Sequence, residues 1–248
     1  MGTNTTSTSS DVEPAALREA IGLLRSSPCR VDGYIDVLGE LDPLSTYRGS
    51  RVFRTRFLPR VYERYSRPLA SRLFLGMRGP RIAEEREMAL EALRIEPGES
   101  VLDVGCGPGN CTRWFSEAAG DGLVIGIDPS PTMLSRAVEL GGERIAYVRG
   151  DGAALPFDDR QFDAVGTFGV LHVMDDPIAA LDEMVRVLAP GGRLALAAFW
   201  GRRKRRVKGV HVFARDELTG RLADRGMTVT EQRLVGRFQF VAARKREG

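Results

Sequence analysis

Three glycines at alternate positions follow a short apolar segment, and an acidic residue precedes them. The stretch from 100 to 110 reads Ser-Val-Leu-Asp-Val-Gly-Cys-Gly-Pro-Gly-Asn. It predicts a buried strand over 101–104, a tight turn, and a helix over 111–119. Glycine permits positive φ and lets a ligand approach the backbone closely, and the amides at a helix start favour an anionic or polar ligand group. The turn is therefore a candidate ligand site.

Two further aspartates each follow a predicted strand. Asp128 ends a strand over 123–127 and lies 21 residues after Gly107. A carboxylate at that place can accept hydrogen bonds from both hydroxyls of a ribose. The alternative is that Asp128 caps the helix that starts after Pro131. Asp151 follows a strand over 145–149 in the same way.

The elements that would position these residues alternate between strand and helix. Such alternation requires crossover connections, so it predicts an α/β fold with a doubly wound, mostly parallel sheet. A helix over 215–225 and two strands joined by only Val235-Gly236 follow, and so short a link allows only antiparallel pairing. The sheet then has seven strands and a C-terminal hairpin. The remaining predicted elements are strands over 162–168, 193–199, 228–234 and 237–243, and helices over 131–140 and 177–188.

The Gly-x-Gly-x-Gly spacing with its preceding acid, followed by Asp128 and Asp151, resembles the class I S-adenosylmethionine-dependent methyltransferases over about residues 95–200. The resemblance implies a Rossmann-like fold, S-adenosylmethionine as cofactor and S-adenosylhomocysteine as product. It also implies that Asp103 organises the glycine loop and meets the methionine ammonium, that Asp128 binds the ribose, and that Asp151 accepts the adenine amino group. The implied cofactor-binding residues are Asp103, Gly105, Cys106, Gly107, Gly109, Asp128, Pro129, Met133, Asp151, Gly152 and Phe168.

The segment from Phe168 to Pro177 is similar to the part of small-molecule methyltransferases that lines the methyl-transfer site. It lacks the Asn-Pro-Pro-Tyr motif that holds an amino nitrogen in many DNA and glutamine N-methyltransferases. His172, one of two histidines, is a candidate catalytic base for an acceptor hydroxyl or acidic carbon. A structural role at the mouth of the cofactor site is the alternative.

The region before residue 95 is predicted to be a disordered tail over 1–10 and a mainly helical extension over 11–94, with helices over 11–26 and 82–93. Its part from 44 to 82 carries ten arginines and one acidic residue among aromatic and aliphatic side chains. We expect either a helical cap with solvated arginines or a lid that closes the substrate pocket and faces an anionic group. Tyr62 and Tyr65 are the candidate lid contacts to substrate.

A second basic run, Arg202 to Lys208, follows the predicted fifth strand. It is either a solvated loop or, with the arginine-rich segment, a basic rim for a phosphorylated substrate, an anionic membrane surface or RNA. The net charge of +3 does not by itself argue for nucleic acid.

Composition predicts one main domain, 95–248, in a chain of 248 residues. The three cysteines lack the spacing of a zinc site or a disulfide framework, so we expect no metal and a cytoplasmic location. The dominance of arginine over lysine is typical of a high-GC bacterial genome. The sequence leaves monomer and homodimer both open.

These observations predict a methyltransferase that uses S-adenosylmethionine on a small acceptor, lipophilic or anionic. Part of the central domain is similar to quinone and lipid C-methyltransferases. The alternatives are an RNA methyltransferase of the same fold, a non-catalytic S-adenosylmethionine-binding regulatory protein, and a nicotinamide dehydrogenase.

Overall fold

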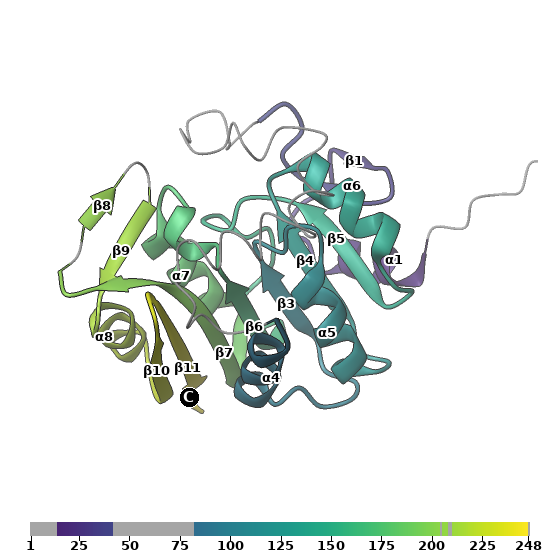
Figure 1. Cartoon of the computed structure of the whole chain (residues 1–248). Coiled ribbons are helices and arrows are strands. Elements are labelled where there is room, and N and C mark those ends of the chain that lie inside the picture. The colour runs from purple at the N-terminus through teal and green to yellow at the C-terminus, as the bar shows by residue number, and fades with distance from the viewer. Residues whose placement is uncertain (1–13, 42–81, 204, 208–209, 248) are drawn as a thin grey trace, which may run out of the picture.

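A computed structural model describes residues 14–41, 82–203, 205–207 and 210–247 (Figure 1). The predicted tail, most of the arginine-rich segment, and the lid candidates Tyr62 and Tyr65 lie outside these ranges. Within them no helix is both long and apolar enough to cross a membrane.

A mostly parallel sheet with helices on both faces forms the centre of the molecule (Figure 1). Its seven central strands run in the order β5-β4-β3-β6-β7-β11-β10, and of these only β11 runs antiparallel to the others, between β7 and β10. The predicted seven strands and C-terminal hairpin are therefore confirmed. The strands are β3 (Val101–Val104), β4 (Val124–Asp128), β5 (Ile145–Arg149), β6 (Phe162–Phe168), β7 (Leu188–Gly201), β10 (Met227–Val235) and β11 (Phe238–Lys245).

The chain order reverses between β3 and β6, which lie side by side at the middle of the sheet. In doubly wound sheets ligands bind outside the carboxyl ends of the strands at this reversal. Because the predicted ligand residues follow β3, β4 and β5, the topology brings them to one edge.

Alternation along the strands divides the core between two faces. Leu102 and Val104 pack on one face with α1 (Ala15–Gly22), α7 (Pro177–Val187) and α8 (Glu217–Asp224). Val101 packs on the other face with α4 (Ile82–Leu93) and α5 (Asn110–Ala119), and α6 (Pro131–Leu140) covers Ile145 and Tyr147. Successive side chains of a strand point to opposite faces, so a buried run such as 101–104 serves both layers.

Four strands were not predicted. β1 (Arg30–Val31) and β2 (Ile35–Asp36) form a hairpin, and β2 pairs in parallel with β5 at the sheet edge. Over 14–41 the expected mainly helical extension is thus one helix plus two strands of the sheet. Two-residue strands are too short to show a hydrophobic period, which is why the sequence did not indicate them.

The basic run after β7 also differs from its prediction as a loop. Residues Arg205–Val207 form β8, which pairs with β9 (Val210–Ala214), and β9 pairs in parallel with the end of β7. This β8–β9 hairpin lies at the opposite end of the molecule from β1 (Figure 1). β7 itself begins at Leu188 and passes through Pro190-Gly191-Gly192, the stretch expected to separate the helix from the strand.

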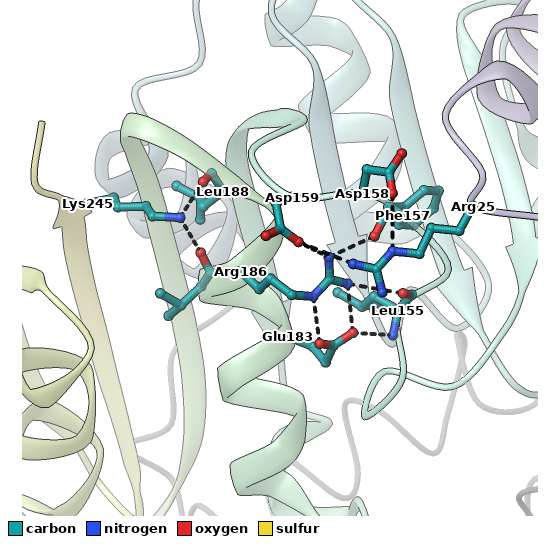
Figure 2. A network of polar contacts seen from close by, with 10 residues as sticks. Arg25, Leu155, Phe157, Asp158, Asp159, Glu183, Arg186, Leu188 and Lys245 are labelled. Carbon is teal, nitrogen blue, oxygen red and sulfur yellow. Dashed lines mark hydrogen bonds and ion pairs between the residues drawn. The ribbon is translucent and has the colours of Figure 1, made fainter. Parts of the chain in front are cut away.

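A polar network joins distant segments on the side of α7 (Figure 2). Arg186 of α7 donates to Glu183, Asp159 and the carbonyls of Leu155 and Phe157. Lys245, in the last strand, donates to the carbonyls of Val185 and Leu188, both at 2.6 Å. The network therefore fixes the loop after β5 and the C-terminal strand to the end of one helix.

Candidate active site

The glycine loop after β3 is held by contacts that exclude side chains at two of its three glycines. A Cβ on Gly105 would lie 2.4 Å from Cγ1 of Val170, and one on Gly109 would lie 2.4 Å from Oη of Tyr147. Gly107 is different, because apart from its chain neighbours its Cβ would meet no atom of the described residues within 4 Å, although its φ is +53°. Gly105 and Gly109 are thus required by packing, whereas Gly107 faces open space where a ligand can approach the backbone.

Asp128, at the end of β4, is bonded directly to this loop. Its Oδ2 accepts a hydrogen bond from the amide of Gly107 at 3.0 Å, and its Oδ1 accepts from the amide of Ser130 at 2.9 Å. Burial raises the pKa of Asp128 to about 6, against the lowering effect of these two bonds. The cap of α6 is Ser130, whose Oγ accepts from the amide of Met133, so Asp128 is not the helix cap that the sequence left as an alternative.

Asp103 lies in β3 and is almost completely buried. The hydroxyl of Thr112, in the first turn of α5, donates to its Oδ2 at 2.6 Å. A charge-assisted bond of this length orients the carboxylate below the glycine loop. Sequence reasoning missed Thr112, since a threonine in a helix carries no signal until its partner is known.

Asp151 and Gly152 follow β5 and approach the same space from the adjacent strand. Oδ1 of Asp151 accepts from the amide of Ala153 at 2.9 Å, which orients the carboxylate within its turn. A Cβ on Gly152 would lie 3.0 Å from Cγ1 of Val104 and 3.1 Å from Cε of Met174. Gly152 therefore lets the turn pack closely over the end of β3.

A cavity of about 390 Å³ lies between these elements, a volume within the range of small-molecule sites. It brings together every predicted cofactor-binding residue except Gly109, which packs beneath the loop instead. The lining residues that the sequence did not assign are Pro108, Asn110, Cys111, Ile127, Ser130, Ala153, Gly169, Val170, Val173, Met174, Asp175 and Asp176. Several of these follow β6, whose resemblance to a methyl-transfer segment was the available signal.

His172 is not among the described residues that line this cavity. It lies in the short helix η5 (Leu171–Val173), where its ring is buried 4.0 Å from the ring of Phe199 and 5.7 Å from that of Phe238. Burial, with a smaller effect of His211, lowers the pKa of His172 to about 3. Such an imidazole is a weak base, and the geometry supports the structural role that the sequence left open.

The comparisons agree with this geometry. A family model described as a methyltransferase domain matches residues 102–196, from within β3 to within β7, and this range includes every predicted cofactor-binding residue. Over this segment the chain is similar to methyltransferase domains. A demethylmenaquinone methyltransferase of Renibacterium salmoninarum is 40% identical over 118 residues, covering 46% of this chain and 47% of that protein.

Two further relatives extend the match beyond the methyltransferase domain. An uncharacterized chloroplastic methyltransferase of Arabidopsis thaliana is 35% identical over 165 residues, covering 63% of this chain and 44% of that one. A crystal structure of a SAM-dependent methyltransferase from Aquifex aeolicus is 25% identical with a TM-score of 0.57, covering 75% of this chain and 97% of that one. The chain spans less than half the length of the Renibacterium salmoninarum and Arabidopsis thaliana relatives.

Proposed function

We propose that the protein transfers a methyl group from S-adenosylmethionine to a small lipophilic acceptor. The observation that carries the proposal is the cavity at the carboxyl ends of β3, β4, β5 and β6. The glycine loop, Asp128 and Asp151 meet there in the chain order that suits the methionine, ribose and adenine parts of one molecule. The cavity also continues along an apolar wall where an acceptor can lie.

The residues present fit the cofactor. Gly107 leaves its backbone accessible, and Asp128 and Asp151 present carboxylates to the cavity. We assign the ribose hydroxyls to Asp128 and the adenine amino group to Asp151, because these hydroxyl and amino groups can donate hydrogen bonds to the two carboxylates. Asp103, held by Thr112, is the assigned partner of the methionine ammonium.

When bound, S-adenosylmethionine supplies a methyl group already activated by its sulfonium. The protein therefore needs to align the acceptor with the carbon–sulfur bond and to exclude water. Phe168, Val170, Val173 and Met174 provide the apolar wall beside the glycine loop. A dedicated base is not required for an acceptor that loses its proton readily.

The apolar wall supports a lipophilic acceptor over an anionic one. Among the described residues that line the cavity, five are aspartates and none is lysine, arginine or histidine. An anionic group inside would face these carboxylates. The name of the demethylmenaquinone methyltransferase relative, whose acceptor is a quinone, supports the same choice.

Calorimetric titration with S-adenosylhomocysteine, with NAD as the control ligand, tests the cofactor assignment. We expect micromolar binding of S-adenosylhomocysteine alone; binding of NAD alone would contradict the proposal. Transfer of a labelled methyl group to a quinone and lipid extract, compared with polynucleotide, then tests the acceptor. Label in polynucleotide, with binding that weakens steeply with salt, would favour an RNA methyltransferase. Tight cofactor binding with no transfer to either pool would favour the non-catalytic alternative.

A further inference from the structure

Arg149 is the last residue of β5, and its side chain donates hydrogen bonds to the end of β2 and to the residues that follow the β1–β2 hairpin. Nη1 donates to both carboxylate oxygens of Asp36, at 3.2 and 2.9 Å, and to the carbonyl of Gly39 at 2.8 Å. Nη2 donates to the carbonyl of Leu41 at 2.7 Å. The Arg149 and Asp36 side chains are only 10% and 14% exposed. A buried pair with this many bonds fixes residues 36–41 against the end of β5.

The backbone of the same residue leads directly into the cofactor cavity. Arg149 lies opposite Asp36 in β2 and opposite Asp128 in β4, so β5 is held between the hairpin and the ribose-side strand. The next amide, that of Gly150, donates to the carbonyl of Asp128 at 3.3 Å. Asp151 then lines the cavity.

The hairpin also packs behind the turn that carries Asp151. The amide of Val37 donates to the carbonyl of Arg149 at 3.2 Å. A Cβ on Gly150 would lie 3.5 Å from Cγ2 of Val37. A displacement of the hairpin is therefore passed to Asp151 through a single intervening residue.

We propose that Arg149 is a positioning residue for adenine recognition: by bonding the N-terminal hairpin to β5, it holds Asp151 where its carboxylate accepts the adenine amino group. This inference rests on the proposed function. Arg149 is not among the residues that line the cavity and acts through Asp151. The hydrogen bond weakens steeply with misalignment, so a small shift of the turn is enough to lose it.

The test compares two ligands, S-adenosylhomocysteine and S-inosylhomocysteine, in which an oxygen replaces the adenine amino group. A hydrogen bond to a carboxylate predicts that the wild-type protein prefers the first by about 10- to 100-fold. Arg149→Met is expected to reduce this preference to less than about threefold, because the amino group then loses its acceptor. Asp151→Ala should reduce it equally.

Arg193 in β7 offers a matched control near the amino ends of the parallel strands, at the edge of the sheet opposite the cavity. It donates to the carboxylate of Glu99 and to the carbonyls of Leu93 and Arg94, and its side chain is 19% exposed. Arg193→Met removes the same kinds of bonds far from Asp151. We expect it to lower the melting temperature and to leave the ligand preference unchanged.

The outcomes distinguish a failure of the proposed function from a failure of the inference about Arg149. If the wild-type protein binds neither ligand, the proposed function fails; if it binds both equally, the adenine assignment and this inference fail. If Arg149→Met keeps the wild-type preference, or Arg193→Met loses it to the same extent, the inference is overturned. Loss confined to Arg149→Met supports it. Should that variant not fold, Arg149→Lys decides, since lysine keeps the charge but cannot span the four acceptors, and a retained preference would overturn the inference.

Discussion

Asp128 couples the cofactor cavity to pH. Burial raises its pKa from 3.8 to about 6, so ionising it costs the ligand-free protein stability as pH rises from about 4 to 6. Ribose hydroxyls donate to the ionised carboxylate, so S-adenosylhomocysteine should bind more weakly as pH falls below 6 and should release protons on binding near that pH. Calorimetry at pH 6 in two buffers of different ionisation heat measures this release.

The control for this prediction is Asp128→Asn. We expect it to bind about 1 to 3 kcal/mol more weakly at pH 7, the scale of a hydrogen bond to a charged group, with an affinity that no longer changes between pH 5 and 7. Equal pH dependence in wild-type and variant proteins would show that another group titrates.

Gly107 permits a test in which strain and ligand contact are separated. Gly107→Val places a branched side chain where, among the described residues, only the chain neighbours lie within 4 Å of the Cβ, in the space assigned to the methionine carboxylate. Gly226 also has a positive φ, +77°, and open surroundings, but lies after α8. Gly107→Val and the control Gly226→Val should each lower the free energy of unfolding by about 1 to 2 kcal/mol, because both positions have a left-handed backbone conformation. Only Gly107→Val should abolish S-adenosylhomocysteine binding. Normal binding by Gly107→Val would remove the loop from the site.

At the scale of elements, η5 is a packing element that carries the apolar wall on one side and His172 on the other. His172→Phe should keep cofactor affinity and methyl transfer, because phenylalanine preserves the contacts with Phe199 and Phe238. In the wild-type protein, the imidazole resonances of His172 should not titrate above pH 5, since its pKa is about 3. Loss of turnover in His172→Phe with unchanged affinity would instead restore His172 as a base.

The elements that sequence patterns could predict are those with a clear period and punctuation. β3 to β6 are apolar runs bounded by glycine, aspartate or proline, and the residues that follow them reach one edge because the strands are parallel. The missed elements depend on distant partners. β2 pairs with β5, more than 100 residues later in the chain, and β8 places arginines in a strand because β9 pairs with it.

His172 illustrates the same limit for a site residue. The aromatic rings that contact His172 belong to Phe199 in β7 and Phe238 in β11, so only the folded chain shows that His172 is buried. Seven residues between Phe168 and Asp176 line the cavity, but the sequence alone could not show which side chains of this segment point into it.

For the whole molecule, the contacts in Figure 2 link the C-terminal strand to the end of α7 and the start of β7. Lys245→Met leaves the carbonyls of Val185 and Leu188 without their charged donor. We expect a loss of about 1 to 3 kcal/mol in the free energy of unfolding, measured by urea denaturation. S-adenosylhomocysteine affinity should be unchanged, because the network lies away from the cavity residues; a matching loss of affinity would show that the two are coupled.

The pairing of β2 with β5 also has a consequence for synthesis on the ribosome. Asp36 and Arg149 are 113 residues apart, so the N-terminal hairpin leaves the exit tunnel long before its partner strand exists. At elongation rates of about 5 to 20 residues per second, the interval is about 6 to 23 s. During that time Asp36 has neither its buried cation nor a sheet to join, and the nascent chain must keep this segment unaggregated until β5 arrives. The β1–β2 hairpin is thus made 113 residues before the strand that it joins.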